Sequence, residues 1–240
     1  MLKLAQKKEG MCIMQRCALL VLLALAFNAA AAEITLDGKL DEPLWKKTEK
    51  HTGFMKAKTR PGADVVKAQT EFYVVSKPDR IYFGIKCDEP KMKEAGQLPG
   101  HSLWVDDGLE IFLGPSGQTW DFYQFRLTVN NMQASLFYSE GGAIQPDPYA
   151  PEWRYAIYRG QDFWSCEVEF PLTAFYMTRQ NLWNTEWLVN VCRTRTPEKE
   201  STSWSPILKG FKESEHFRKS KVSPCANPPM MSGSPMPKPS

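Results

Sequence analysis

One segment, HSLWVDDGLEIFLGP at residues 101–115, combines a tryptophan, three carboxylates and the alternation of a β-strand. Two carboxylates about 5 to 9.5 Å apart could hydrolyse a glycosidic bond held between them. Asp106 and Asp107 are adjacent, however, and neighbouring residues on a strand point to opposite faces. The segment therefore favours a binding role over a catalytic pair.

Other catalytic signatures are missing from the sequence. The histidines are His51, His101 and His216, and none lies in a metal-binding or triad motif. The sequence also has no G-x-S-x-G, no H-E-x-x-H and no glycine-rich phosphate loop. We therefore expect a protein that is not an enzyme.

Carboxylates in turns allow a second chemistry. CDEP at 87–90 and VDDG at 105–108 place acidic side chains at the ends of expected strands. Calcium prefers several hard oxygen ligands from loops of this kind. Aspartates also cap ordinary solvated turns, so both interpretations stay open.

The elements that must position these residues are strands. The periodicity is two almost throughout, and Gly, Pro, Asp and Asn clusters separate short runs of Phe, Tyr, Val and Ile. Strands are expected at 70–75, 81–87, 109–113, 122–129, 133–138, 155–158, 164–170 and 187–193, with brief helices at 43–48 and 172–175. This pattern predicts an all-β, antiparallel, jelly-roll-like β-sandwich in a single domain.

Residues 109–113 and 122–129 are expected to form a hairpin. Pairing across the intervening turn places Glu110 opposite Arg126, on the face that points away from the apolar core. A slip of one residue would separate them. The two side chains could contact a ligand or form an ordinary surface ion pair.

Trp104 lies just outside the strand, between polar residues and a carboxylate turn. Proteins hold sugars by stacking the C–H-rich face of the sugar on such a ring, while charged planar groups bind the hydroxyls. Core filling is the alternative for Trp104, and a core position is expected for Trp45.

The two ends of the chain differ from its middle. Residues 1–32 carry basic residues, an apolar run and a small-residue site, which is typical of a cleaved signal peptide and predicts a secreted or periplasmic protein. Residues 33–219 form the predicted domain, and the Pro/Ser-rich residues 220–240 form a predicted disordered tail.

Cleavage would change the charge and the cysteine count. It removes four basic residues and one acidic residue from totals of 30 and 27, which leaves 26 of each. This balance favours neither a nucleic-acid partner nor a membrane surface after cleavage. Four cysteines remain, and their pairing stays open: Cys87, Cys166, Cys192 and Cys225.

Six segments, in this order, resemble family 9 carbohydrate-binding modules: ITLDGKLDEPLWKKT, DRIYFGIKCDEP, SLWVDDGLEIFLGP, FYQFRLTVN, WSCEVEFPLTAF and LVNVCRTR. The resemblance covers residues 34 to about 217. It implies an antiparallel β-sandwich that binds plant-type glycans or their ends, with structural calcium. The implied ligands are cello- or xylo-oligosaccharides, and the implied partner is a separate glycoside hydrolase that breaks down the polysaccharide.

The resemblance also implies roles for particular residues. Trp104 matches the first of two tryptophans that clamp a sugar, and Phe211 stands where the second is usual. Glu110 and Arg126 match a pair that hydrogen-bonds the sugar hydroxyls.

Two weaker matches concern metal, and one departure concerns the last strand. Asp88 matches a carboxylate of a cation-binding loop, and Asp107 is a second candidate ligand for calcium. FRKSKVSPCANPP at 217–229 replaces the glycine and hydrophobic strand usual in the family, so the last strand is expected to be weakened or lost.

Two other functions remain as alternatives. The chain could be a haem-binding electron-transfer domain, with His101 and either Met132 or Met177 as ligands, although no C-x-x-C-H attachment motif is present. It could also be a structural or adhesive sandwich whose sugar site has decayed.

Overall fold

The computed structural model describes residues 34–58, 65–97, 102–139, 142–144, 149–176 and 186–222, with the backbone alone at 142–144. The predicted signal peptide and residues 223–240 of the predicted tail lie outside these ranges. The chain divides into two compact units. One includes Asp41–Thr48, and the other consists of Leu36–Leu40 and the chain from Glu49 onward.

The first unit contains helix α2, Pro43–Lys47. Pro43 suits the first turn of a helix, where its missing N–H has no intrahelical partner. The Thr35 backbone N–H donates to Glu42 Oε1 over 2.9 Å. Trp45 is buried, as expected from the sequence. None of the helices in the described ranges is long and apolar enough to span a membrane.

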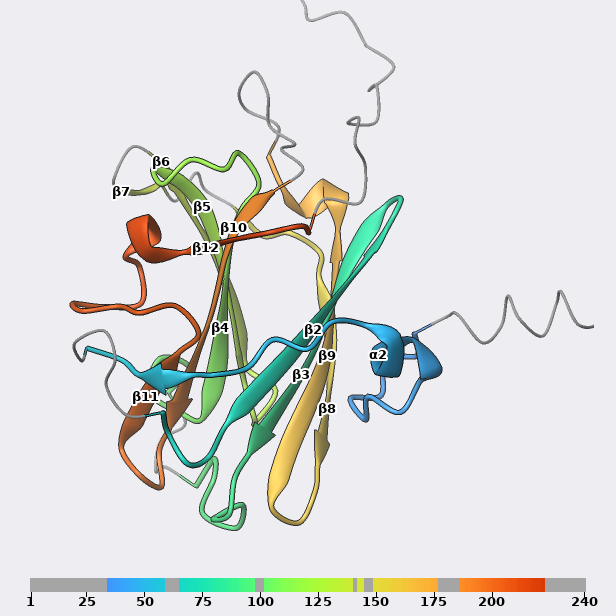
Figure 1. Cartoon of the computed structure of the whole chain (residues 1–240), viewed down its shortest axis with the longest axis vertical. Helices are drawn as coiled ribbons and strands as arrows, with labels where there is room; N and C mark the ends of the chain where they lie inside the picture. Colours follow the sequence, from blue (N-terminus) through green and yellow to red (C-terminus); the bar gives the residue numbers. More distant parts are fainter. Residues whose placement is uncertain are drawn as a thin grey trace, which may run out of the picture. The chain divides into compact units, whose positions relative to one another are not determined.

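The second unit contains two antiparallel sheets (Figure 1). The smaller sheet has four strands in the order β2-β3-β9-β8. Their bounds are Thr70–Lys77 for β2, Arg80–Asp88 for β3, Arg154–Arg159 for β8 and Phe163–Pro171 for β9. A short 3-10 helix, Leu172–Ala174, follows β9.

The larger sheet has eight strands in the order β1-β11-β10-β4-β5-β6-β7, with β12 also paired to β10. Their bounds are Met55–Lys56 for β1, Gly108–Gly114 for β4, Asp121–Thr128 for β5, Gln133–Ser139 for β6, Gly142–Ile144 for β7, Trp187–Arg195 for β10, Glu200–Ser203 for β11 and Arg218–Ser220 for β12. A 3-10 helix, Ser214–His216, precedes β12. The predicted two-sheet antiparallel sandwich is confirmed.

All eight predicted strands are present within about two residues of their expected ends. The strands that the sequence did not indicate are β1, β7, β11 and β12, which have only two to four residues each. A strand of two to four residues is too short to show an alternation of apolar and polar side chains. The last strand was expected to be weakened or lost, and β12 survives as three residues against β10.

Alternation places one face of each sheet in the core. Leu109, Ile111 and Leu113 of β4 belong to the same buried cluster as Phe83 of β3 and Val168 of β9. Full burial of each such side chain stabilises the fold by roughly 1.5–3 kcal/mol. The expected core face of β4 is confirmed.

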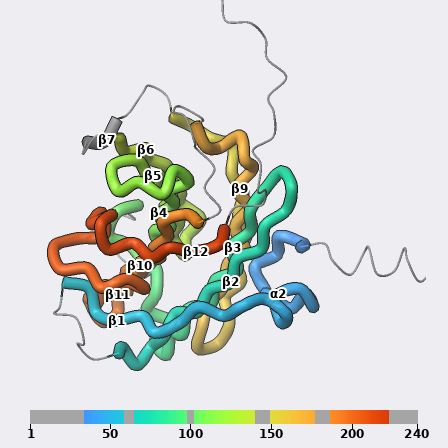
Figure 2. Tube along the Cα trace, turned by 45° about the horizontal axis from the view of Figure 1, so that its top comes forward, coloured from blue at the N-terminus to red at the C-terminus, as the bar shows by residue number. Residues whose placement is uncertain are grey.

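The other face of the larger sheet is also covered. A second buried cluster contains Phe112, Phe122, Tyr138 and Leu188 from the sheet together with Phe217. The tube in Figure 2 shows the red segment before β12 running across the strands of this sheet. Even-numbered residues of β4 are therefore covered by this second cluster and are largely shielded from solvent.

We expect Gly38→Ala to destabilise the fold by about 1–3 kcal/mol. Gly38 has φ of +82°, and an added Cβ would lie 2.6 Å from the backbone nitrogen of Tyr158. Its N–H donates to Glu167 over 2.9 Å, so the segment cannot easily withdraw. Gly53→Ala is the matched control, because Gly53 has φ of +85° but open space around it. Urea unfolding measures the free energy of unfolding of both variants, and the difference between them is the cost of the steric clash at Gly38. Equal losses of stability in the two variants would contradict this clash.

Candidate functional site

The predicted pairing of β4 with β5 is confirmed, with Glu110 directly opposite Arg126. Arg126 Nη1 donates to Glu110 Oε1 over 2.6 Å. The Arg126 side chain is fully buried and that of Glu110 is 10% exposed. This is therefore not the exposed surface pair that was the alternative. Because β5 carries Arg126 on the same face as Gln124, the same register brings in further partners.

Gln124 and Tyr138 extend the pair into a chain of hydrogen bonds. Gln124 Nε2 donates to Glu110 Oε2 over 2.5 Å. Tyr138 Oη in turn donates to Gln124 Oε1 over 2.7 Å. Both oxygens of Glu110 are therefore held by donors from β5. The sequence analysis assigned no role to these two residues, although alternation already placed Gln124 on the face of Arg126.

Burial is the largest influence on the pKa of Glu110 and raises it above its usual value. The charge of Arg126 and the hydrogen bonds from Gln124 and Arg126 act in the opposite direction. Glu110 is thus a partly desolvated carboxyl group, fixed in position, with the remainder of its surface toward a pocket.

Arg126 also fixes the loop that carries Trp104. Its Nε donates to the carbonyl oxygen of Leu103, and its Nη2 donates to that of Asp106 over 3.0 Å. The guanidinium carbon lies 5.8 Å from the centroid of the Trp104 ring. Arg126 is therefore a support in this structure, and the sugar contact expected for it stays a prediction.

Trp104 is not a core residue: it is 48% exposed. Val105, the next residue, is 54% exposed, so the loop presents apolar surface to solvent. An exposed tryptophan held over a buried ion pair offers a flat stacking surface. Such a surface is what the clamp interpretation of Trp104 requires.

Phe211 lies in the segment between β11 and β12 and packs against the second cluster. Glu213 holds this segment in shape, because its carboxylate accepts hydrogen bonds from the backbone N–H groups of Leu208, Lys209 and Gly210 at 2.7, 2.5 and 3.3 Å. The Ser214 hydroxyl donates to the carbonyl oxygen of Thr119. Phe211 therefore stands on a braced segment.

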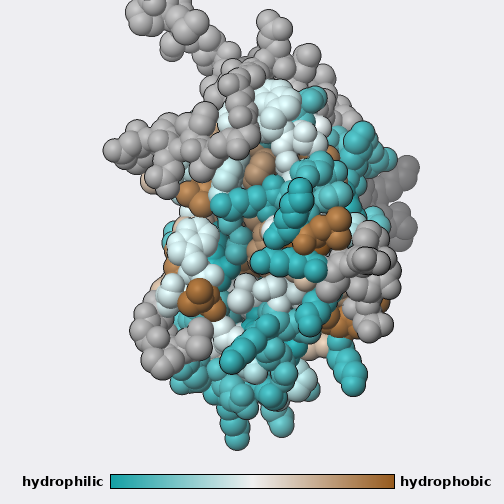
Figure 3. Space-filling model, turned by 90° about the vertical axis from the view of Figure 1, so that its left-hand side faces the viewer, coloured by the Kyte–Doolittle hydropathy of each residue, from teal (hydrophilic) through white to brown (hydrophobic). Residues whose placement is uncertain are grey.

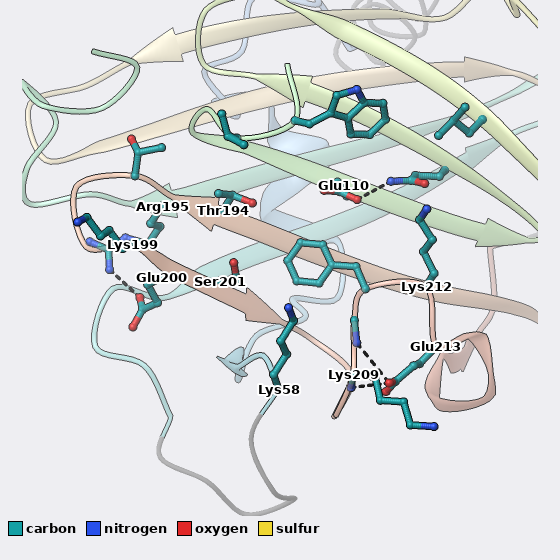
Figure 4. Close-up of a pocket in the computed structure, with 17 residues that line it drawn as sticks. Lys58, Glu110, Thr194, Arg195, Lys199, Glu200, Ser201, Lys209, Lys212 and Glu213 are labelled. Atoms are coloured by element: carbon teal, nitrogen blue, oxygen red, sulfur yellow. Dashed lines mark hydrogen bonds and ion pairs between the residues drawn. The ribbon is translucent and has the colours of Figure 1, made fainter. Parts of the chain in front are cut away.

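Trp104, Glu110 and Phe211 line one pocket of about 980 Å³ (Figure 4). The structure thus brings together residues from β4, the preceding loop and the segment before β12. The other lining residues are Lys58, Val105, Gln124, Leu136, Thr194, Arg195, Thr196, Lys199, Glu200, Ser201, Lys209, Gly210, Lys212 and Glu213. Figure 3 shows one face of the molecule, with mostly hydrophilic side chains and small separate apolar areas.

One end of the pocket rests on a buried charge cluster. Glu89 is fully buried and accepts hydrogen bonds from Arg195 Nε at 2.9 Å and Arg193 Nη2 at 3.0 Å. Arg195 also pairs with Glu200 at 2.8 Å. The sequence analysis singled out Asp88, beside Glu89. Residues 193–195 read RTR, and alternation places both arginines on the core face of β10. This pattern could have predicted a buried carboxylate as their partner.

The two predicted calcium ligands are engaged by protein groups. Asp107 is fully buried and accepts hydrogen bonds from the backbone N–H groups of Gly96 at 3.0 Å and Thr196 at 3.2 Å. Asp88 lies 3.5 Å from Lys86 in a surface ion pair. Within the described ranges, no three His, Cys, Asp or Glu side chains converge. N–H donors aimed at Asp107 do not suit a cation, so calcium stays a prediction with no part in the function proposed below.

The residues suspected of binding haem are not brought together in the described ranges. His101 and Met177 lie outside them, and Met132 is partly buried. Cys87, Cys166 and Cys192 are buried free thiols, whereas Cys225 lies outside. Burial raises the pKa of Cys87 to about 11, which makes it unreactive near neutral pH.

Solved structures share this fold. A family 9 carbohydrate-binding module from Caldicellulosiruptor kristjanssonii in complex with glucose matches with a TM-score of 0.55 and 13% identity, over 79% of this chain and 91% of that one. Such a module from the same organism in complex with cellotriose matches at 0.56 and 13%, over 85% and 96%. A candidate carbohydrate-binding protein from Bacteroides uniformis matches at 0.56 and 14%, over 76% and 91%.

Sequence comparison finds no matching family model and no matching curated protein. At these identities the structural matches establish the fold. The resemblance to family 9 carbohydrate-binding modules, indicated by the six ordered segments, is therefore confirmed at the level of the β-sandwich.

Proposed function

We propose that this chain is a non-catalytic carbohydrate-binding domain whose site is the pocket between Trp104 and Phe211. The observation that carries the proposal is the exposed Trp104 ring, fixed beside a buried carboxylate, Glu110, in one pocket. A sugar would stack its apolar face on the indole, and its hydroxyls would donate to the free lone pairs of Glu110.

Preorganisation strengthens this interpretation. Binding costs less free energy when the contacting side chains are already ordered. Arg126 and Gln124 hold both oxygens of Glu110, and Glu213 holds the segment that carries Phe211. These contacts would let a small ligand bind without first ordering the site.

The structural matches support a class of ligand for this pocket. The Caldicellulosiruptor kristjanssonii modules are described in complex with glucose and with cellotriose. We accordingly propose that this chain binds cello- or xylo-oligosaccharides, in the secreted or periplasmic space, in support of a separate glycoside hydrolase. Isothermal titration of the protein with cellobiose and xylobiose tests the proposal.

We expect Trp104→Ala to lower the affinity for the bound oligosaccharide by at least about 2 kcal/mol, or roughly 30-fold. The stacking surface is lost, while the fold is kept because the ring is half exposed. Titration calorimetry measures the affinity, and circular dichroism checks the fold.

Tyr158→Ala is the matched control, since Tyr158 is 37% exposed on β8 of the smaller sheet. Its affinity should equal that of the parent protein. Unchanged binding in Trp104→Ala, or an equal loss in Tyr158→Ala, would place the site elsewhere.

A further inference from the structure

The proposed sugar pocket has a surplus of positive charge. Four exposed lysines line it: Lys58, Lys199, Lys209 and Lys212. Within the part of the chain that the structure describes, none of them forms an ion pair with a carboxylate. Figure 4 shows Lys199 at one end of the pocket and Lys212 near Glu110 at the other.

The carboxylates of the pocket offset only part of this charge. Lys212 interacts electrostatically with Glu110 and lies 5.0 Å from the centroid of the Tyr138 ring, and Glu213 adds one negative charge to the lining. Glu110 pairs with Arg126, and Glu200 pairs with Arg195 at 2.8 Å. Glu213 accepts its hydrogen bonds from backbone N–H groups. The surplus is local, because the chain after predicted cleavage has equal numbers of acidic and basic residues.

Two of the lysines stand where the backbone disfavours them. Lys58 and Lys199 have φ of +61° and +48°, in the left-handed region that glycine and asparagine adopt at least cost. Both residues line the same pocket (Figure 4).

A neutral sugar cannot form ion pairs with the four ammonium groups that line the pocket. An anionic ligand could form such pairs and would gain free energy from them. We propose that the pocket binds an acidic oligosaccharide, one whose units carry a carboxylate or a sulfate ester. This inference rests on the proposed function and names the chemical class of its ligand.

The test compares three ligands of one length: a neutral xylo-oligosaccharide, the same chain bearing one glucuronate, and the same chain bearing one sulfate ester. At low salt we expect at least one acidic ligand to bind about tenfold more tightly than the neutral one. In about 0.5 M salt the advantage should shrink to twofold or less, because exposed charges are then screened within a few ångströms. The acidic ligand that binds more tightly shows whether the pocket prefers a carboxylate or a sulfate ester.

Lys199→Gln/Lys212→Gln should reduce the acidic preference, measured as the ratio of the affinities for the acidic and the neutral ligand, about fivefold or more. The matched control is Lys67→Gln/Lys93→Gln, which removes the same charge from exposed lysines outside the pocket. It should leave the preference unchanged.

The outcomes separate this inference from the proposed function. Equal affinity for the neutral and acidic ligands, with both lost in Trp104→Ala, would overturn the charge inference alone. A preference that survives Lys199→Gln/Lys212→Gln, or falls equally in the control, would also overturn it. Failure of all three ligands to bind folded protein would overturn both.

Discussion

Glu110→Ala is expected to abolish oligosaccharide binding and to lower the free energy of unfolding by about 3–5 kcal/mol. The stability loss arises because Arg126 is fully buried and would keep its charge without its 2.6 Å partner. Gln124 would also lose the acceptor of its side-chain N–H. The binding loss arises because Glu110, a buried carboxylate that lines the pocket beside Trp104, is removed.

A double variant separates these two effects. Replacing a buried ion pair by apolar residues of similar size is often neutral or stabilising. Glu110→Leu/Arg126→Met should therefore recover most of the stability lost in Glu110→Ala, yet should still fail to bind. Urea unfolding and titration calorimetry measure the two properties independently.

Recovery of binding in the double variant would show that the Glu110 carboxylate does not contact the ligand. If Glu110→Leu/Arg126→Met is as unstable as Glu110→Ala, the unpaired charge of Arg126 is not the cause of the stability loss. The guanidinium contacts to Leu103 and Asp106 would then matter more than the ion pair.

The second large effect is expected for Glu89→Ala, which should lower the free energy of unfolding by about 3–5 kcal/mol. Glu89 is fully buried between Arg193 and Arg195, so its removal leaves two guanidinium groups without their shared partner. Arg195 keeps Glu200, but Arg193 keeps only a long contact to Thr70 at 3.4 Å. Glu198→Gln is the control, because Glu198 pairs with Lys91 on the surface. It should leave the free energy of unfolding close to that of the parent protein, because surface ion pairs contribute little.

The pH dependence of stability provides a second test of the role of Glu89. Burial alone would raise its pKa, but the hydrogen bonds and charges of Arg195 and Arg193 outweigh burial and hold the pKa below its ordinary value of 4.5. A lowered pKa means that the contribution of Glu89 to stability is complete above pH 4.5 and is lost as the pH falls through the folded-state value. Glu89→Gln should therefore lose less stability on acidification from pH 6 to pH 3 than the parent protein. An equal acid sensitivity in the two proteins would contradict the assignment.

Much of the fold could be predicted because β-strands of six or more residues have a visible period. The alternation in residues 109–113 and 122–129 gave the core face, and the turn between them gave the register of Glu110 against Arg126. The strands β1, β7, β11 and β12 could not be predicted in this way, since pairing with a neighbour rather than local pattern forms them.

The sequence by itself determined the sandwich, the adjacency of Glu110 and Arg126, and the place of Trp104 outside the strand. Each of these follows from local periodicity and from hairpin geometry. Only the tertiary structure decided that the Glu110–Arg126 pair is buried, that Glu89 and not Asp88 is the buried acid, and that four lysines share a pocket with Trp104. The physical reason is that burial and charge surplus depend on segments far apart in the chain, such as residues 58, 110, 199 and 212, whose approach no local pattern encodes.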